Sequence, residues 1–368
     1  MPPTRTPDAA AHERLRYDRA PRRVYWEVTR ACDLACIHCR AAAVAARNPL
    51  ELDHAAALRL LDGLAAFGDP LPHLVLTGGD PLKRPDLFAL IAAARARGLR
   101  VAVSPSATPL VTPAVVRQLA AAGVEAISLS VDGSTAARHD AFRGVPGTFG
   151  RTLAAARAAH AAGLPVQVNT LVARTTLGDL EGIARLAREM HAARWSLFFL
   201  VTVGRGDLLE PITPAECETL LRWVAALPPG KPVVTTTEAP HYRRVVRESD
   251  RVRGGAGHAA GIRDGNGIMF ISHTGDVSPS GFLPLVAGNV THTPPAAIYR
   301  DTELFRSLRD ADRFRGRCGA CEYRWECGGS RARAYAASGD PFAEDPLCHY
   351  RPGMSAGEVG RPARAVNS

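Results

Sequence analysis

Lysine is almost missing from this chain of 368 residues, and blocks of like charge are missing altogether. Only Lys83 and Lys231 are lysines, so the other 43 of the 45 basic residues are arginine. Abundant arginine and alanine fit a GC-rich coding bias, but the guanidinium group also suits carboxylate and phosphate partners. Because aromatic residues do not alternate with basic ones, the formal charge of +9 does not indicate a nucleic-acid platform, and we expect no nucleic-acid partner.

Long hydrophobic runs are also missing. No apolar stretch approaches the roughly 18–20 residues that span a bilayer, and the first 23 residues lack the apolar region of a signal peptide. We therefore expect a cytoplasmic protein without a membrane partner. Thiols stay reduced in that compartment, so the eight cysteines are expected to be metal ligands or catalytic groups rather than disulfides.

Strand and helix patterns alternate six times along the first two thirds of the chain. Such βα units predict a parallel sheet covered by helices, either an open doubly wound sheet or a partial barrel. No glycine fingerprint of the dinucleotide-binding kind follows the first strand. The expected strands are 24–29, 73–79, 99–104, 125–133, 164–173 and 194–201, and the expected helices are 53–67, 84–98, 112–123, 147–163, 177–193 and 213–227.

The character of the sequence changes after residue 227. A connection is expected at 228–250, then a glycine-rich loop at 251–267, a hairpin at 267–279 and a short helix at 301–310. The predicted organisation is listed from the N-terminus: a mobile segment 1–23, a barrel domain 24–227, the connection 228–250, a small cysteine-rich domain 251–351 and a mobile tail 352–368.

Three cysteines, Cys32, Cys36 and Cys39, follow the first expected strand with the spacing Cys-x3-Cys-x2-Cys. Thiolates at such short spacings hold iron–sulfur clusters. Three thiolates leave one iron of a 4Fe–4S cluster open, and an open metal position can bind a substrate or cofactor. The alternative is a zinc site completed by His38, which lies inside the motif.

These features resemble the radical SAM superfamily, in which this cysteine loop follows the first strand of a partial (βα)6 TIM-like barrel. There the open iron binds the amino and carboxylate groups of S-adenosylmethionine (SAM). The segment "TGGDP" is similar to the Gly-Gly-Glu-Pro segment that holds the methionine amino group, which implies a SAM-binding role for Gly78, Gly79, Asp80 and Pro81. Asp80 replaces the commoner glutamate.

Three further segments carry the resemblance, each at a strand's carboxyl end, where barrel enzymes keep their chemistry. Ser106 stands where many members have asparagine, Ser130 and Asp132 match a segment near the ribose, and Arg143 lies in an Arg-Gly loop that implies pairing with the SAM carboxylate. The resemblance implies reductive cleavage of SAM to a 5′-deoxyadenosyl radical that abstracts a hydrogen atom. It also implies a reducing partner such as a flavodoxin or ferredoxin.

A second set of cysteines lies near the C-terminus: Cys318, Cys321, Cys327 and Cys348. Spacing alone leaves zinc as an alternative. Beside a radical SAM core, the set resembles a SPASM domain, which carries auxiliary 4Fe–4S clusters. Ser280 and Arg331 stand where the full form has cysteines. The resemblance therefore implies one auxiliary 4Fe–4S cluster with four protein ligands, suited to electron transfer.

Two substrate classes remain open. The segments "SPSATPL" and "CGGSRARAYAASGDPFAEDPLC" resemble enzymes that modify tetrapyrrole propionates in haem or haem d1 biosynthesis, and Arg331 and Arg333 are expected to pair with propionates. The alternative is a maturase acting on a ribosomally made peptide, although only about 23 residues precede the first strand, too few for a leader-binding domain. A non-enzymatic iron–sulfur carrier is a third possibility.

The remaining residues with metal-binding chemistry are interpreted as bystanders. Cys217 lies alone on an expected helix, and His241, His258 and His273 are expected to be solvated loop residues. The sequence does not decide which bond is broken, the electron donor, the oligomeric state or whether SAM is regenerated.

Overall fold

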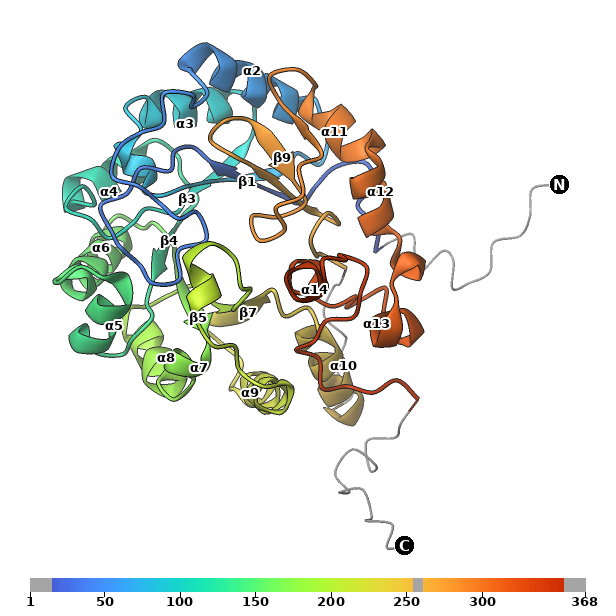
Figure 1. Ribbon diagram of the computed structural model, residues 1–368. Coiled ribbons are helices and arrows are strands. Elements are labelled where there is room, and N and C mark those ends of the chain that lie inside the picture. The colour runs from blue at the N-terminus through green and yellow to red at the C-terminus, as the bar shows by residue number, and fades with distance from the viewer. Residues whose placement is uncertain (1–14, 254–260, 354–368) are drawn as a thin grey trace, which may run out of the picture.

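A computed structural model of the chain describes residues 15–253 and 261–353. Its centre is one ten-stranded sheet with the order β10-β9-β8-β1-β2-β3-β4-β5-β6-β7. From β1 to β7 the strands are parallel and consecutive, and helices form a ring outside them (Figure 1). The strands are β1 (Arg23–Glu27), β2 (His73–Thr77), β3 (Arg100–Val103), β4 (Ala126–Ser130), β5 (Val166–Val172), β6 (Arg194–Phe199), β7 (Val233–Thr237), β8 (Ile268–Ile271), β9 (Asp276–Ser278) and β10 (Gly288–Asn289).

The helices begin where the sequence supplies caps. Asp53, Thr112 and Thr213 each accept a backbone N–H at a helix start, and Gly98 and Gly123, with φ of 78° and 79°, follow helix ends. The helices are α2 (His54–Ala65), α3 (Leu87–Ala96), α4 (Pro113–Ala121), α5 (Ala136–Arg143), α6 (Thr148–Ala161), α7 (Arg174–Leu177), α8 (Leu180–Glu189), α9 (Pro214–Ala226), α10 (Tyr242–Arg253), α11 (Pro295–Asp301), α12 (Glu303–Arg309), α13 (Gly316–Ala320) and α14 (Arg331–Ser338), with 3-10 turns η1 (Pro81–Lys83), η2 (Gly204–Leu208) and η3 (Ala311–Arg313). No helix in the described ranges is long and apolar enough to cross a membrane.

Side chains on the outer face of the strands are buried under the helices, whereas side chains on the inner face line an open cavity. In β1, Val24 and Trp26 are fully buried under the helices, whereas Arg23 and Tyr25 are half-buried and line a cavity. A closed eight-stranded barrel fills its interior with side chains. Here the parallel strands do not close into such a barrel, and the interior stays open for a ligand.

The expected connection at 228–250 is wrong, because this segment contains the strand β7 and most of the helix α10. The flanking prolines and glycine of "PPGKP" suggest a loop, but the Val-Thr run beyond them pairs in parallel with β6. The expected hairpin is confirmed as β8 and β9. Its first strand also pairs in parallel with β1, so the C-terminal segment extends the barrel sheet at its open edge.

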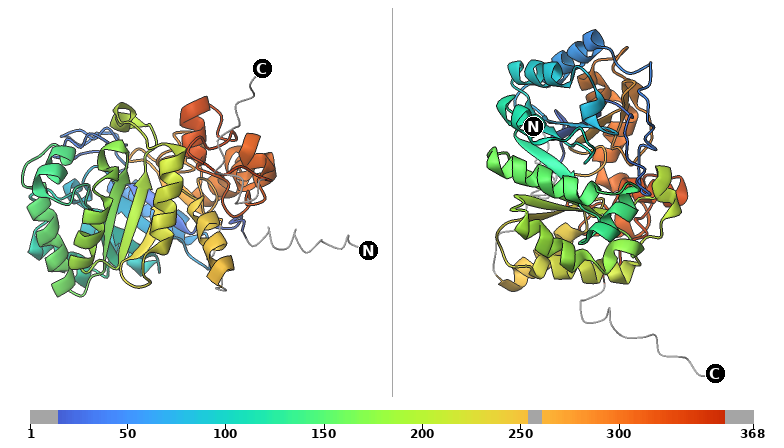
Figure 2. Two further views of the ribbon diagram at one scale, coloured as in Figure 1. Left: turned by 90° about the horizontal axis from the view of Figure 1, so that it is seen from below. Right: turned by 90° about the vertical axis from the view of Figure 1, so that its left-hand side faces the viewer.

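Helices α11 to α14 cover this edge, and the last of them lies beside the barrel opening (Figures 1 and 2). The expectation of a mobile N-terminal segment is wrong for residues 15–22, which are tied to the C-terminal part. Arg309 pairs with Asp18 at 2.8 Å, and the Tyr299 hydroxyl donates to the carbonyl of Tyr17 at 2.7 Å. Residues 1–14, 254–260 and 354–368, including His258, lie outside the described residues.

Candidate active site

The loop after β1 gathers Cys32, Cys36 and Cys39 at the carboxyl end of the barrel. Cys32 and Cys36 are buried and Cys39 is half-buried. Backbone N–H groups of Leu34 and Ala43 donate to the sulfur atoms of Cys32 and Cys39, each at 3.4 Å. Hydrogen bonds to sulfur stabilise thiolates that ligate iron.

The Gly-Gly turn after β2 packs directly against this loop. Gly79 N donates to Thr29 O at 2.8 Å, and Asp80 N donates to Ala31 O at 2.7 Å. A Cβ atom on Gly79 would lie 2.4 Å from Ala31 O, closer than side chains are found in proteins. Only glycine fits at this position because the two backbone segments approach each other so closely. The turn and the cysteine loop therefore form one rigid unit.

Asp80 lies beneath the turn and does not line the cavity. Its carboxylate accepts the Thr108 hydroxyl at 2.7 Å and the backbone N–H of Leu82 at 3.1 Å. Burial raises the pKa of Asp80 above its ordinary value, although these hydrogen bonds oppose the rise. Pro81 is buried beside it. The structure thus places Asp80 and Pro81 as supports of the turn, whereas Gly78, Gly79 and Ser106 line the cavity.

A buried ion pair lies opposite the turn. The guanidinium of Arg143, the last residue of α5, pairs with Asp132 and also lies 3.6 Å from the sulfur of Cys36. Burial raises the pKa of Asp132, but the Arg143 charge, two nearby histidines and the hydrogen bond from the backbone N–H of Leu171 together outweigh burial, so the pKa lies below the ordinary value. Arg143 Nε is buried with no hydrogen-bond partner among the described residues, so one donor is left for a ligand.

His139 joins this group, and the sequence interpretation missed it. Its Nδ1 accepts the backbone N–H of Asp132 at 3.2 Å, which leaves Nε2 as the N–H donor. Burial and the Arg143 charge lower the pKa of His139 to about 4, so the ring is neutral. The Nε2 atom has no partner in the described part of the chain, and the residue lines the cavity. His139 lies four residues before Arg143, and two residues at this spacing share one face of a helix. This spacing was the feature of the sequence that could have identified His139.

One cavity of about 910 Å³ joins these elements and continues down the barrel interior. It brings together nine of the eleven residues predicted near the N-terminal motifs. They are Cys32, Cys36, Cys39, Gly78, Gly79, Ser106, Ser130, Asp132 and Arg143.

The sequence matches the model of the Radical SAM superfamily over residues 26–187. It is 41% identical to an AdoMet-dependent heme synthase of Methanosarcina barkeri, over 91% of this chain and 98% of the relative. The chain belongs to the radical SAM superfamily. A second AdoMet-dependent heme synthase, from Nitratidesulfovibrio vulgaris, is also 41% identical, over 89% of this chain and 92% of its own.

More distant members share the architecture. A PqqA peptide cyclase of Ruegeria pomeroyi is 30% identical, over 90% of this chain and 88% of its own. The crystal structure of Streptococcus suis SuiB superposes with a TM-score of 0.71 at 16% identity, over 93% of this chain and 81% of that one. At this identity the likeness shows the fold alone. The predicted partial barrel and the enzyme class are confirmed.

The site's donors fit a 4Fe–4S cluster and SAM. Three thiolates with N–H···S contacts leave one iron without a protein ligand, as a SAM-binding cluster requires. The unpartnered Arg143 Nε suits a carboxylate. His38, the alternative zinc ligand, instead packs against Phe142, with the ring centroids 4.7 Å apart and the rings tilted by 32°, and burial lowers the pKa of His38 to about 4.

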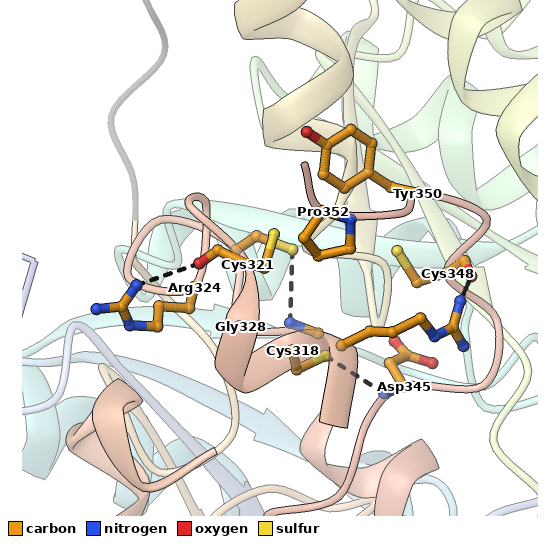
Figure 3. A pocket seen from close by; sticks show the side chains of 11 residues that line it. Cys318, Cys321, Arg324, Gly328, Asp345, Cys348, Tyr350 and Pro352 are labelled. Atoms are coloured by element: carbon orange, nitrogen blue, oxygen red, sulfur yellow. Dashed lines mark hydrogen bonds between the residues drawn. The ribbon is translucent and has the colours of Figure 1, made fainter. Parts of the chain in front are cut away.

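The C-terminal cysteines line a second, small pocket. Cys318, Cys321, Cys327 and Cys348 surround it, and Figure 3 shows sulfur atoms directed toward a shared space. Four thiolates that line one pocket can each bind a different iron of a four-iron cluster, so the residue types present fit that group.

Hydrogen bonds to sulfur recur at this pocket. Gly329 N donates to Cys327 Sγ, and Asp345 N donates to Cys318 Sγ, both at 3.4 Å. Arg331 also donates to Cys318 Sγ, at 3.5 Å. The surroundings of these sulfurs therefore resemble those of the first cysteine loop.

Arg331 and Arg333 do not line the barrel cavity, so their expected pairing with propionates is wrong. Arg331 is fully buried and donates to the carbonyls of Pro341 and Ala343. Arg333 is buried and pairs with Asp345 at 3.1 Å. Both arginines hold the cysteine-rich loops together.

The expectation of solvated histidines is wrong for His241 and His273. His241 is 2% exposed, with Nε2 3.1 Å from the sulfur of Cys217, which is fully buried in α9. His273 is 6% exposed, and its Nδ1 lies 2.9 Å from Glu27 at the end of β1. His241 also lies 3.9 Å from Asp345, so both histidines join the C-terminal segment to the barrel.

A carboxyl pair between the two cysteine sites was also missed. Glu238 follows β7 with a φ of 58°, and Asp264 precedes β8. Both line the cavity, and burial together with the Asp264 charge holds the pKa of Glu238 well above its ordinary value. Ser330, beyond Cys327, donates to Glu238. The sequence separates the two acids by 26 positions, so no spacing rule joins them.

Proposed function

We propose that this protein oxidatively decarboxylates propionate side chains of an iron tetrapyrrole in haem biosynthesis. The observation that carries the proposal is the 41% identity to an AdoMet-dependent heme synthase across nearly the full length of both chains. The open barrel supports it, because a cavity of about 910 Å³ leaves room for a large flat ligand beside SAM.

The site residues have distinct tasks in this proposal. Cys32, Cys36 and Cys39 hold the first 4Fe–4S cluster, and Gly78–Gly79, Ser106, Ser130, Asp132 and Arg143 surround SAM. When bound, the cluster supplies the electron that cleaves SAM to methionine and a 5′-deoxyadenosyl radical. The buried ion pair between Asp132 and Arg143 fixes the position of the guanidinium that we propose for the SAM carboxylate.

The reaction balances with one electron acceptor. A propionate loses a hydrogen atom from the carbon next to the ring, which converts 5′-deoxyadenosyl to 5′-deoxyadenosine. The bond to the carboxylate then breaks, CO₂ leaves, a vinyl group remains, and one electron departs. Cys318, Cys321, Cys327 and Cys348 hold the auxiliary cluster that we propose as acceptor. With four protein ligands it has no open iron for substrate.

Two further assignments belong to this proposal. The reducing electron comes from a flavodoxin or ferredoxin, and the enzyme works in the cytoplasm, where its eight thiols stay reduced. The peptide maturase remains the second candidate, because a peptide cyclase is 30% identical over most of the chain.

The test is anaerobic reconstitution with iron and sulfide, followed by SAM, dithionite and iron-coproporphyrin. Mass spectrometry measures the porphyrin and 5′-deoxyadenosine. Loss of carboxyl groups in step with 5′-deoxyadenosine is the expected result. Formation of 5′-deoxyadenosine with an unchanged porphyrin would refute the substrate and leave the superfamily chemistry intact.

A further inference from the structure

Four of the parallel barrel strands begin with a basic side chain at the far end of the cavity. Arg23 on β1 is in register with His73 on β2, which is in register with Arg100 on β3. Arg194 begins β6 across the opening. All four side chains line the cavity. We call this set the floor.

The basic side chains of the floor differ in whether a carboxylate neutralises their charge. Arg100 pairs with Glu125 at 2.8 Å. Among the side chains of residues 15–249 and 261–353, neither Arg23 nor Arg194 has a carboxylate within 4.0 Å or a side-chain hydrogen-bond partner. Burial lowers the pKa of Arg194, and the nearby Arg23 charge lowers it further, so the two guanidinium groups repel each other.

Two further basic residues lie near Arg23 and Arg194, and Glu125, which also lines this end of the cavity, already pairs with Arg100. Arg243 reaches this region from α10 and donates only to the carbonyls of Glu326 and Ile262. Burial and the arginine charges lower the pKa of His73 to about 4, and its Nε2 is buried without a partner in the described residues. Arg23 and Arg194 are half-buried guanidinium groups without a carboxylate partner, so this end of the cavity is suited to an anion.

The position of the floor sets the size of the ligand. His73 and the end of β2 at Thr77 are four residues apart, which is about 13 Å along the strand. Gly78 follows at the SAM end. A ligand that reacts beside SAM therefore reaches the floor only if it is large and carries its negative groups on the edge opposite the reacting group.

We propose that Arg23 and Arg194 bind the carboxylates of the substrate that do not react, and so fix which side chain faces SAM. This inference rests on the proposed function and adds a substrate subsite to it. The planar guanidinium groups can bind carboxylates bidentately, which orients the ligand as well as holding it. Arg23 and Arg194 take the role that the sequence interpretation gave to Arg331 and Arg333.

The test compares Arg23→Gln and Arg194→Gln with Arg100→Gln, a control whose charge is already neutralised by Glu125. The probes are coproporphyrin and its tetramethyl ester, titrated by porphyrin fluorescence against cluster-loaded protein with SAM. We expect Arg23→Gln and Arg194→Gln each to weaken coproporphyrin binding about tenfold or more, and Arg100→Gln less than threefold. The ester is expected to bind the parent and all variants alike.

The iron content and melting temperature of each variant show whether weaker binding comes from loss of the subsite or from loss of the fold. Arg194→Lys keeps the positive charge and should recover part of the affinity for coproporphyrin. Equal coproporphyrin binding by the parent, Arg23→Gln and Arg194→Gln would overturn the inference. The proposed function would still stand in that case if the parent converts iron-coproporphyrin. If the parent neither binds coproporphyrin nor converts its iron complex, the proposed function is wrong and the inference falls with it.

Discussion

Replacing Gly79 with alanine tests whether the Gly-Gly turn and the cysteine loop act as one unit. The added Cβ would lie 2.4 Å from Ala31 O and 2.6 Å from Arg30 O, both backbone atoms that cannot rotate away. Ordinary contact begins near 3.4 Å. The turn and the loop must therefore separate by about 1 Å, which breaks the hydrogen bonds from Gly79 and Asp80.

The magnitude follows from these contacts. Overpacking of this kind costs about 1–3 kcal/mol of folding stability. A shift of about 1 Å between the reacting groups is expected to lower the rate of SAM cleavage about 100-fold. The assay measures 5′-deoxyadenosine formation by the reconstituted Gly79→Ala protein, with iron content and SAM affinity measured in parallel.

Gly150→Ala is the matched control, because a Cβ at Gly150 meets nothing within 4 Å. It lies inside α6, where alanine is the better helix former by about 1 kcal/mol, so this variant should be as active as the parent and slightly more stable. A Gly79→Ala protein with parental iron content, SAM affinity and cleavage rate would refute the close-approach argument.

Three further predictions concern the remaining parts of the site. Cys348→Ala should lower bound iron from about eight to about four atoms per chain, measured chemically after reconstitution, whereas Cys217→Ala should leave it unchanged. Arg143→Lys keeps the charge beside Asp132 but loses the guanidinium fork, so calorimetry should show SAM binding weakened about tenfold with normal iron content. Glu238→Gln should alter the pH dependence of stability. Because the pKa of Glu238 is raised in the folded state, the folded protein holds a proton that the unfolded chain releases, and stability falls as pH rises from about 4.5 toward the folded value. Denaturation between pH 5 and 8 should therefore show a shallower decline for Glu238→Gln than for the parent, and parallel curves would contradict the raised pKa.

Local patterns predicted most of the barrel because they reflect local physics. Caps such as Asp53 and Thr213 and helix-ending glycines such as Gly98 define elements within a few residues. The strand β7 was missed because its Val-Thr run is short and flanked by proline, and only pairing with β6 makes it a strand. Helix α5 was missed because its sequence reads as a loop around the Arg-Gly motif.

The sequence by itself determined the cysteine loop, the Gly-Gly turn and the order of the βα units, because neighbouring residues and strand ends carry that information. Only the tertiary structure decided which charges meet. It buried Arg331 and Arg333 among carbonyls and Asp345, and it placed Arg23 and Arg194 in one cavity with no carboxylate at ion-pairing distance in the described ranges. The reason is physical: the energy of a charge depends on its burial and on distant partners, which only the folded chain brings together.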